Sequence, residues 1–164
     1  MRNWFRRTGP SPAWIALAVA LAALPVSGAR AQDHEHGHEG GAQTLQLDHG
    51  NKWTTDAPLR EAMTAIRDAL QADHPAIHAR TQPPAAYQAL AQHIDAQIAH
   101  IVAHCKLPAD ADANLHVLLA QIIGGADDMR GGDPQLARGG AVRVIQALNQ
   151  YPQYFDHPGW KSVH

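Results

Sequence analysis

The chain has a single cysteine, Cys105, among its 164 residues. One thiol cannot form an intramolecular disulfide, so packing must stabilise the fold, with metal binding or oligomerisation as the available additions. The absence of a Cys-x-x-Cys-His motif excludes ordinary covalent haem attachment. The sequence also lacks a nucleophile elbow and a phosphate-binding glycine loop, so we expect a protein that is not an enzyme.

No apolar run is long enough to cross a membrane. The longest, from Ala13 to Leu24, has 12 residues, whereas a spanning helix needs about 20. It follows three arginines within the first seven residues and precedes Ala29-x-Ala31, an arrangement typical of a secretory signal. We predict that residues 1–31 are a signal peptide cleaved after Ala31, and that the mature protein is periplasmic, with no stable membrane span.

Positive charge is scarce once this segment is removed. Residues 1–31 contain four arginines and no acid, which leaves nine basic against fifteen acidic residues and a formal charge of −6. A nucleic-acid partner requires clustered lysine and arginine, so the balance argues against one. The remaining 133 residues fit one domain with a sizeable core.

The predicted mature chain begins with a histidine-rich segment, residues 32–44. It alternates His34, His36 and His38 with acids and glycines, so it cannot bury apolar surface and should be disordered. Such a tract chelates transition metals weakly without any fold. The other interpretation, which the sequence leaves open, is a solubilising linker whose histidines have no role.

Residues 45–164 contain four helical patterns. The first begins near Asp56 and ends at Pro75, the second runs from about Pro84 to Lys106, the third extends from Pro108 to Gly131, and the fourth from Pro134 to Pro152. Each has one apolar face, and short connections favour antiparallel neighbours. No alternating strand pattern is present. We therefore predict an all-α, up-down-up-down four-helix bundle, with Trp53 and the aromatic tail at 154–160 packing across its ends.

The spacing of large apolar residues predicts which face of each helix is buried. Met63 and Met129 lie on these faces and are expected to fill gaps in the core. In the third helix, polar groups near Pro108 should cap the start, and Gly124-Gly125 favours close approach of a neighbouring helix. For the fourth helix, the predicted buried face consists of Leu136, Val142, Ile145 and Leu148.

The second helix carries the most informative polar residues. His93, Gln97, His100 and His104 share one stripe, and the i,i+4 spacing of the last two brings both imidazoles within reach of one metal ion. His116 in the third helix joins them if the helices pair in a suitable register. Imidazole suits zinc, copper or nickel, so the expected cofactor is zinc or copper. The alternative is a solvated histidine row without a ligand.

Two other functions remain open. One is an interaction module that binds another envelope protein through a bundle face or the aromatic tail, with incidental histidines. The other is a non-covalent haem bundle, which pairs axial ligands from two helices. The fourth helix has no histidine between Pro134 and Gln150, which makes the haem bundle the weaker of the two.

Three stretches resemble a group of small exported proteobacterial helical proteins, some labelled DnrO-like. They are LDHGNKWTTDAPLR at 47–60, IVAHCKLP at 101–108 and YFDHPGW at 154–160. The resemblance covers most of the mature chain and implies export and a helical domain. The group has no assigned activity, so the resemblance implies no catalytic residue.

Overall fold

The computed structural model describes residues 44–164. The predicted signal peptide and the histidines His34, His36 and His38 lie outside these residues. The described part forms helices α1 (Ala57–Ala79), α2 (Pro84–His104), α3 (Ala109–Arg130) and α4 (Pro134–Tyr154), with two short strands, β1 (Trp53–Thr54) and β2 (Phe155–Asp156). None of these helices is long and apolar enough to cross a membrane.

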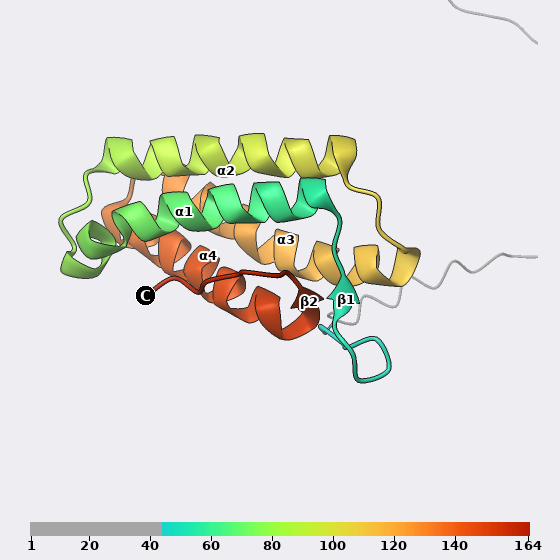
Figure 1. Cartoon of the computed structure of the whole chain (residues 1–164). Coiled ribbons are helices and arrows are strands. Elements are labelled where there is room, and N and C mark those ends of the chain that lie inside the picture. The colour runs from blue at the N-terminus through green and yellow to red at the C-terminus, as the bar shows by residue number, and fades with distance from the viewer. Residues whose placement is uncertain (1–43) are drawn as a thin grey trace, which may run out of the picture. The chain divides into compact units, whose positions relative to one another are not determined.

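The helices run alternately up and down, and each packs against the next one in the chain (Figure 1). The α3–α4 interface is the most extensive, and α1 closes the bundle by contacting α4. Large aliphatic side chains fill the space between the helices, and Met63 and Met129 are both fully buried there. The predicted all-α four-helix bundle is therefore confirmed, as is the gap-filling role of the two methionines.

Helix α1 begins where the sequence predicts and ends later. The Asp56 carboxylate accepts a hydrogen bond from the Leu59 amide at 3.0 Å, which caps the first turn. The prediction that Pro75 ends the helix is wrong, because α1 continues to Ala79 and its last turns bend away from the earlier axis (Figure 1). A proline inside a helix costs ~3 kcal/mol. Burial of Ile77, which is 1% exposed, offsets that cost.

The ends of α2 and α3 differ slightly from the prediction. Helix α2 stops at His104, and the Cys105 amide closes its last turn by donating to the Ile101 carbonyl at 2.8 Å. Helix α3 begins after Pro108 without a side-chain cap, so the expected polar cap is wrong. Asp110 and Asp112 lie in its first turn instead, where negative charge is favoured by the helix dipole.

Helix α4 buries a different face from the one its large residues predict. Leu136 is 58% exposed, whereas Leu148 is fully buried. Val142 and Ile145 are only half-buried. The helix also continues past Pro152 to Tyr154, so the predicted end at Pro152 is wrong. The residues of α4 that are buried are mostly small: Ala137, Gly140, Ala141, Val144, Ala147, Leu148 and Tyr151.

Two glycines explain why small residues form this face. A Cβ atom on Gly125 of α3 would lie 2.6 Å from the Gly140 carbonyl oxygen of α4. A Cβ atom on Gly140 would lie 2.7 Å from the Cβ of Asp128 and would also collide with the Gly125 carbonyl. The two backbones are thus in direct contact, which only residues without side chains permit. The close approach expected for Gly124-Gly125 is made by Gly125.

The segments that flank the bundle pair with each other. β1 and β2 form a parallel two-stranded ladder in which Trp53 is opposite Phe155, a short strand pairing that the sequence did not predict. Phe155 is fully buried, and Tyr151 stacks on it with ring centroids 5.3 Å apart. The Trp53 lead-in packs against the core, as expected. The tail runs along the side of α1 and α4, where His164 bonds to Gln71 and Val163 to Asn149, so the prediction that it packs across an end of the bundle is wrong.

Candidate functional site

His100 and His104 form a pair at the surface near the end of α2. Their ring centroids are 4.7 Å apart, with an angle of 51° between the ring planes. His100 is half-buried and His104 is exposed. The histidine side chains that make hydrogen bonds or ion pairs within residues 44–164 are His49, His93, His116 and His157. The His100 and His104 nitrogens are therefore available to a ligand in the described part.

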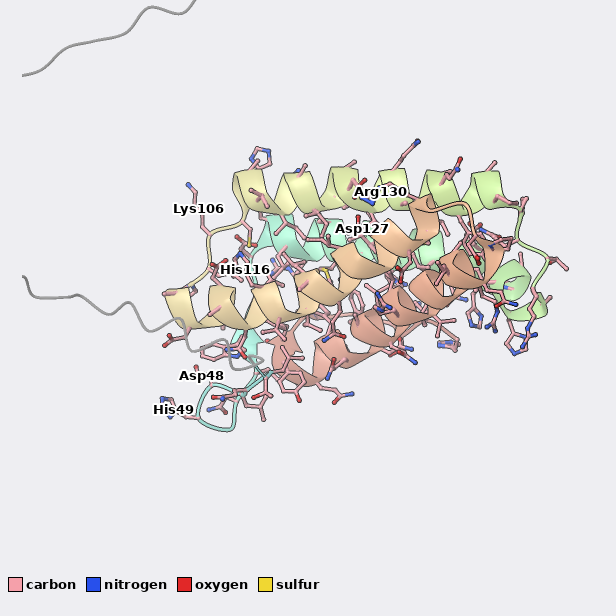
Figure 2. The ribbon with its side chains drawn as sticks, turned by 180° about the vertical axis from the view of Figure 1, so that it is seen from behind. Asp48, His49, Lys106, His116, Asp127 and Arg130 are labelled. Carbon is pink, nitrogen blue, oxygen red and sulfur yellow. The ribbon has the colours of Figure 1, made fainter. Side chains whose placement is uncertain are left out.

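The position of this pair along α2 favours a cation. His104 is the last residue of the helix, where unpaired carbonyl groups and the helix dipole place partial negative charge. A metal ion held by two imidazoles at this end gains from that field. Lys106, two residues further on, lies in the connection to α3 (Figure 2) and is exposed, so water screens its opposing charge.

His93 does not join this pair. Its Nε2 atom lies 3.3 Å from the Ala65 carbonyl oxygen of α1, and the residue is half-buried between the two helices. An imidazole in this contact donates Nε2–H to the carbonyl and holds α2 against α1. His93 is therefore a contact between helices, although it shares a stripe of α2 with His100 and His104.

His116 is also separate. It projects from the exposed side of α3 (Figure 2), and its Nδ1 atom lies 2.8 Å from the Asp112 carbonyl oxygen and 3.4 Å from the Asp112 carboxylate. Within residues 44–164, no three side chains of histidine, cysteine, aspartate or glutamate come together in a way that could hold a metal ion. Of the four histidines predicted on α2 and α3, only His100 and His104 form a pair.

A second histidine pair was missed from the sequence. His74 and His78 are also i,i+4, on α1, with ring centroids 6.1 Å apart. This pair lies near the end of α1, so the two pairs occupy opposite ends of the antiparallel α1–α2 hairpin. The same spacing rule identifies it, but Pro75 between the two histidines suggested that the helix stopped there.

His157 forms a cluster with residues from α1 and α4. Its Nδ1 atom lies 3.3 Å from the Tyr151 hydroxyl and its Nε2 atom 3.4 Å from the Thr64 hydroxyl. Burial lowers the pKa of His157, and the positive charges of Arg60 and Arg67 lower it further. Both ring nitrogens are engaged and the surroundings are cationic, so this histidine locks the tail onto the bundle and is poorly suited to bind a metal.

Cys105 lies against a carboxylate. Its thiol is 3.5 Å from the Asp56 side chain, and the residue is half-buried. Burial, together with the negative charge of Asp56, raises the pKa of the Cys105 thiol to about 12. A thiol held in its protonated form is a poor nucleophile and a poor metal ligand, as expected for an inert cysteine.

The comparisons with known proteins assign no class to this site: no protein-family model, no curated protein and no solved structure matches the chain. Any functional argument therefore depends on the chemistry of the residues themselves.

Proposed function

We propose that this chain is an exported, non-enzymatic helical-bundle protein that binds or buffers a transition metal, zinc or copper, through histidines. Export is inferred from the signal-like residues 1–31. The observation that carries the metal proposal is the His100–His104 pair, whose rings are 4.7 Å apart and whose nitrogens are available. Two imidazoles one helical turn apart are a chelating arrangement.

The number of ligands indicates what kind of site this is. Structural zinc sites are closed by four protein ligands, whereas a two-histidine site leaves coordination positions to water or to a second donor. Such a site is weak and exchangeable, which suits buffering or delivery better than structural stabilisation. The histidines at 34, 36 and 38 supply further imidazoles on the same chain.

The test is isothermal titration of Zn(II) and Cu(II) into the mature chain, residues 32–164. Three variants accompany it: a chain lacking residues 32–41, His100→Ala with His104→Ala, and His93→Ala as the matched control on the same helix. We expect the double variant to lose the helical site, with a fall in affinity beyond the ~10–100-fold that removal of an outer-shell partner causes. His93→Ala should keep the affinity, because its ring contacts the Ala65 carbonyl.

Two further results decide the proposal. Binding should weaken as the pH falls, because a protonated imidazole cannot bind a metal. If the intact mature chain binds neither metal at micromolar concentration, the proposal is wrong. If only the chain lacking residues 32–41 loses binding, the histidine-rich segment is the site and the helical pair is incidental.

The rival interaction module cannot be tested simply by replacing Trp160 in the aromatic tail. Trp160 packs against Tyr151, with ring centroids 4.8 Å apart, and the Arg67 guanidinium lies 5.7 Å from its ring centroid. Replacing Trp160 would therefore disturb the fold before it disturbed a partner. No observation in the described part favours this second function over metal binding.

A further inference from the structure

A cavity of about 370 Å³ opens at the end of the bundle where α1 leads into α2 and where α4 begins. This volume is at the lower end of the range for small-molecule pockets. Two segments far apart in the sequence contribute to it: the α1–α2 connection together with the start of α2, and the first two turns of α4 (Figure 1). We call it the arginine pocket. Its lining residues are Arg80, Gln82, Tyr87, Pro134, Gln135 and Arg138.

Arg138 is held in place by one of its nitrogens. Its Nε donates to the Ile77 carbonyl oxygen at 3.1 Å, and the residue is half-buried. This bond fixes the guanidinium plane and leaves the two terminal nitrogens for a ligand. A planar pair of N–H donors with a fixed orientation matches the two oxygens of a carboxylate.

Arg80 adds a second guanidinium. In the described part, the arginines that form ion pairs are Arg67, Arg130 and Arg143, so neither Arg80 nor Arg138 has a carboxylate partner there. Arg80 caps the end of α1 with φ at +59°, a region that glycine or asparagine usually occupies. The Arg80 side chain lines the cavity, and no carboxylate of the described part pairs with it.

Tyr87 provides a hydroxyl donor at the wall of the cavity. It is 2% exposed and lines the cavity, yet its hydroxyl has no hydrogen-bond partner among residues 44–164. Burial raises the pKa of this phenol, and the positive charge of Arg138, which lines the same cavity, partly opposes the rise. The hydroxyl is not one of the enclosed unpaired atoms of residues 44–164, so water reaches it, and a bound carboxylate would take the place of that water as acceptor.

Two carboxylates near the pocket limit the charge of its ligand. Asp73 accepts a hydrogen bond from the Gln82 side chain at 2.6 Å, and Asp133 caps α4 through the Gln135 and Leu136 amides at 2.7 and 3.0 Å. Both are bonded to neutral donors and leave the arginines unpaired. Their charges nevertheless disfavour a multiply charged anion such as a nucleotide. The pocket suits one negative charge on a small, planar group.

We infer that the arginine pocket binds a small organic carboxylate, held by the fork of Arg138, the charge of Arg80 and the hydroxyl of Tyr87. The carboxylate belongs either to a free organic acid or to the C-terminus of a short peptide, since both present the same group. This site is independent of the histidine pair. Either site can exist without the other.

The test is a titration of the mature chain followed by nuclear magnetic resonance of the backbone amides. The probes are benzoate, its neutral isostere benzamide, acetyl-glycine, a tripeptide with a free C-terminus, and inorganic phosphate. We expect benzoate, acetyl-glycine or the tripeptide to shift the amides near Gln82, Tyr87 and Gln135 at millimolar concentration, and benzamide to have no effect. A preference for the tripeptide over acetyl-glycine would identify a peptide terminus as the source, and the reverse a free acid.

Three variants and a control tie the binding to the named residues. Arg80→Gln and Tyr87→Phe should each weaken carboxylate binding. The loss of affinity should be about 10-fold or more for Arg80→Gln, which removes a charged donor. Arg138→Lys keeps the charge but loses the fork, and should weaken it similarly. Arg143→Gln removes an arginine of α4 that pairs with Asp128 at 2.9 Å, outside the pocket, and should leave the affinity unchanged.

Arg80→Gln is the decisive variant, because the Arg80 side chain has no partner in the described part and its loss does not endanger the fold. If none of the carboxylates shifts these amides, the inference is wrong. It is also wrong if Arg80→Gln and Arg138→Lys bind as well as the wild-type chain. Stronger binding of phosphate than of every carboxylate would overturn the assigned ligand class.

Discussion

The α3–α4 and α1–α2 interfaces are built in different ways. Between α3 and α4, Gly125 and Gly140 bring the backbones into contact, and the nearby carboxylate of Asp128 pairs with Arg143 at 2.9 Å. Between α1 and α2, individual polar contacts supplement larger side chains, such as His93 on the Ala65 carbonyl. The first interface depends on close packing and the second partly on hydrogen bonds.

The two helix pairs also differ in whether their polar side chains already have partners. Charged side chains near the end of α3 pair with neighbours: Arg130 bridges Asp127 of its own helix and Asp95 of α2, at 2.6 and 2.9 Å (Figure 2). Among the candidate ligand-binding groups, the two histidine pairs and Arg80 have no partner in the described part, and they lie on α1, on α2 or in their connection. We therefore expect ligands to bind at the ends of the α1–α2 hairpin.

The largest effect should come from the buried side of α4. Leu148 is fully buried and Leu136 is 58% exposed. The same change from leucine to alanine at these two positions of α4 therefore compares a buried site with an exposed one. Leu148→Ala should lower the free energy of unfolding by about 2–5 kcal/mol, through lost burial and a cavity. Leu136→Ala should change it by less than about 0.5 kcal/mol. Urea denaturation followed by circular dichroism measures both, and equal losses would contradict the buried face described above.

The next effect concerns the glycine contact itself. Gly140→Ala places a Cβ atom against the Gly125 carbonyl and 2.7 Å from the Asp128 Cβ, so the helices must separate. We expect a loss of about 1–3 kcal/mol in the free energy of unfolding. The neighbouring Gly139 has nothing within 4 Å of such a Cβ, and Gly139→Ala should stabilise the helix by about 0.5–1 kcal/mol. Opposite signs at adjacent positions are the result to look for in thermal denaturation.

The contrasts between Leu148 and Leu136 and between Gly140 and Gly139 show why the sequence predicted the four helices but not the buried face of α4. Asp133 followed by Pro134 fixes where the helix begins, and the cap is present. Its inward face cannot be read from large apolar residues, because the neighbouring backbone of α3 leaves no room for them. Pro75 was misread for a similar reason. Burial of Ile77 depends on tertiary contacts, which local proline rules do not include.

The sequence predicts the candidate site only where its residues lie within one helix. The i,i+4 pair His100–His104 follows from helical geometry alone, and the structure places the two rings together. Whether His93 and His116 join the pair depends on the register between helices, which the sequence does not determine. The arginine pocket combines residues from the α1–α2 connection, α2 and α4, so no local pattern indicates it.

The smallest effect concerns the hydrogen bonds of Asp56, which belong to the α1–α2 interface. Asp56 caps α1 and also accepts the Lys106 amide at 2.7 Å, which ties the start of α1 to the connection after α2. Burial tends to raise the pKa of Asp56, but the hydrogen bonds from the Lys106 and Leu59 amides outweigh it, and the pKa is lowered. A depressed carboxyl pKa contributes stability that is complete above the unfolded value and is lost as the pH falls through the folded value.

The ordinary pKa of an aspartate carboxyl is 3.8, so the contribution to stability should be complete at neutral pH and fade below about pH 4. Asp56→Asn keeps the cap but turns an amide donor toward Lys106, and should cost about 1 kcal/mol at pH 7. At pH 3 the difference in the free energy of unfolding between the wild-type chain and Asp56→Asn should be smaller. Asp133→Asn, a cap bonded only to amides of its own helix, is the control and should cost less.

Hydrogen exchange resolved by helix locates this effect. Acid should speed exchange in the first turns of α1 in the wild-type chain. Amides around Gly125 and Gly140 should stay protected, because direct contact of the two backbones, rather than the Asp128–Arg143 ion pair, holds α3 and α4 together. Faster exchange across α3 and α4 at the same pH would mean that the two interfaces open as one cooperative unit. The contrast between a packed interface and a hydrogen-bonded one would then describe how each is built, but not how the bundle unfolds.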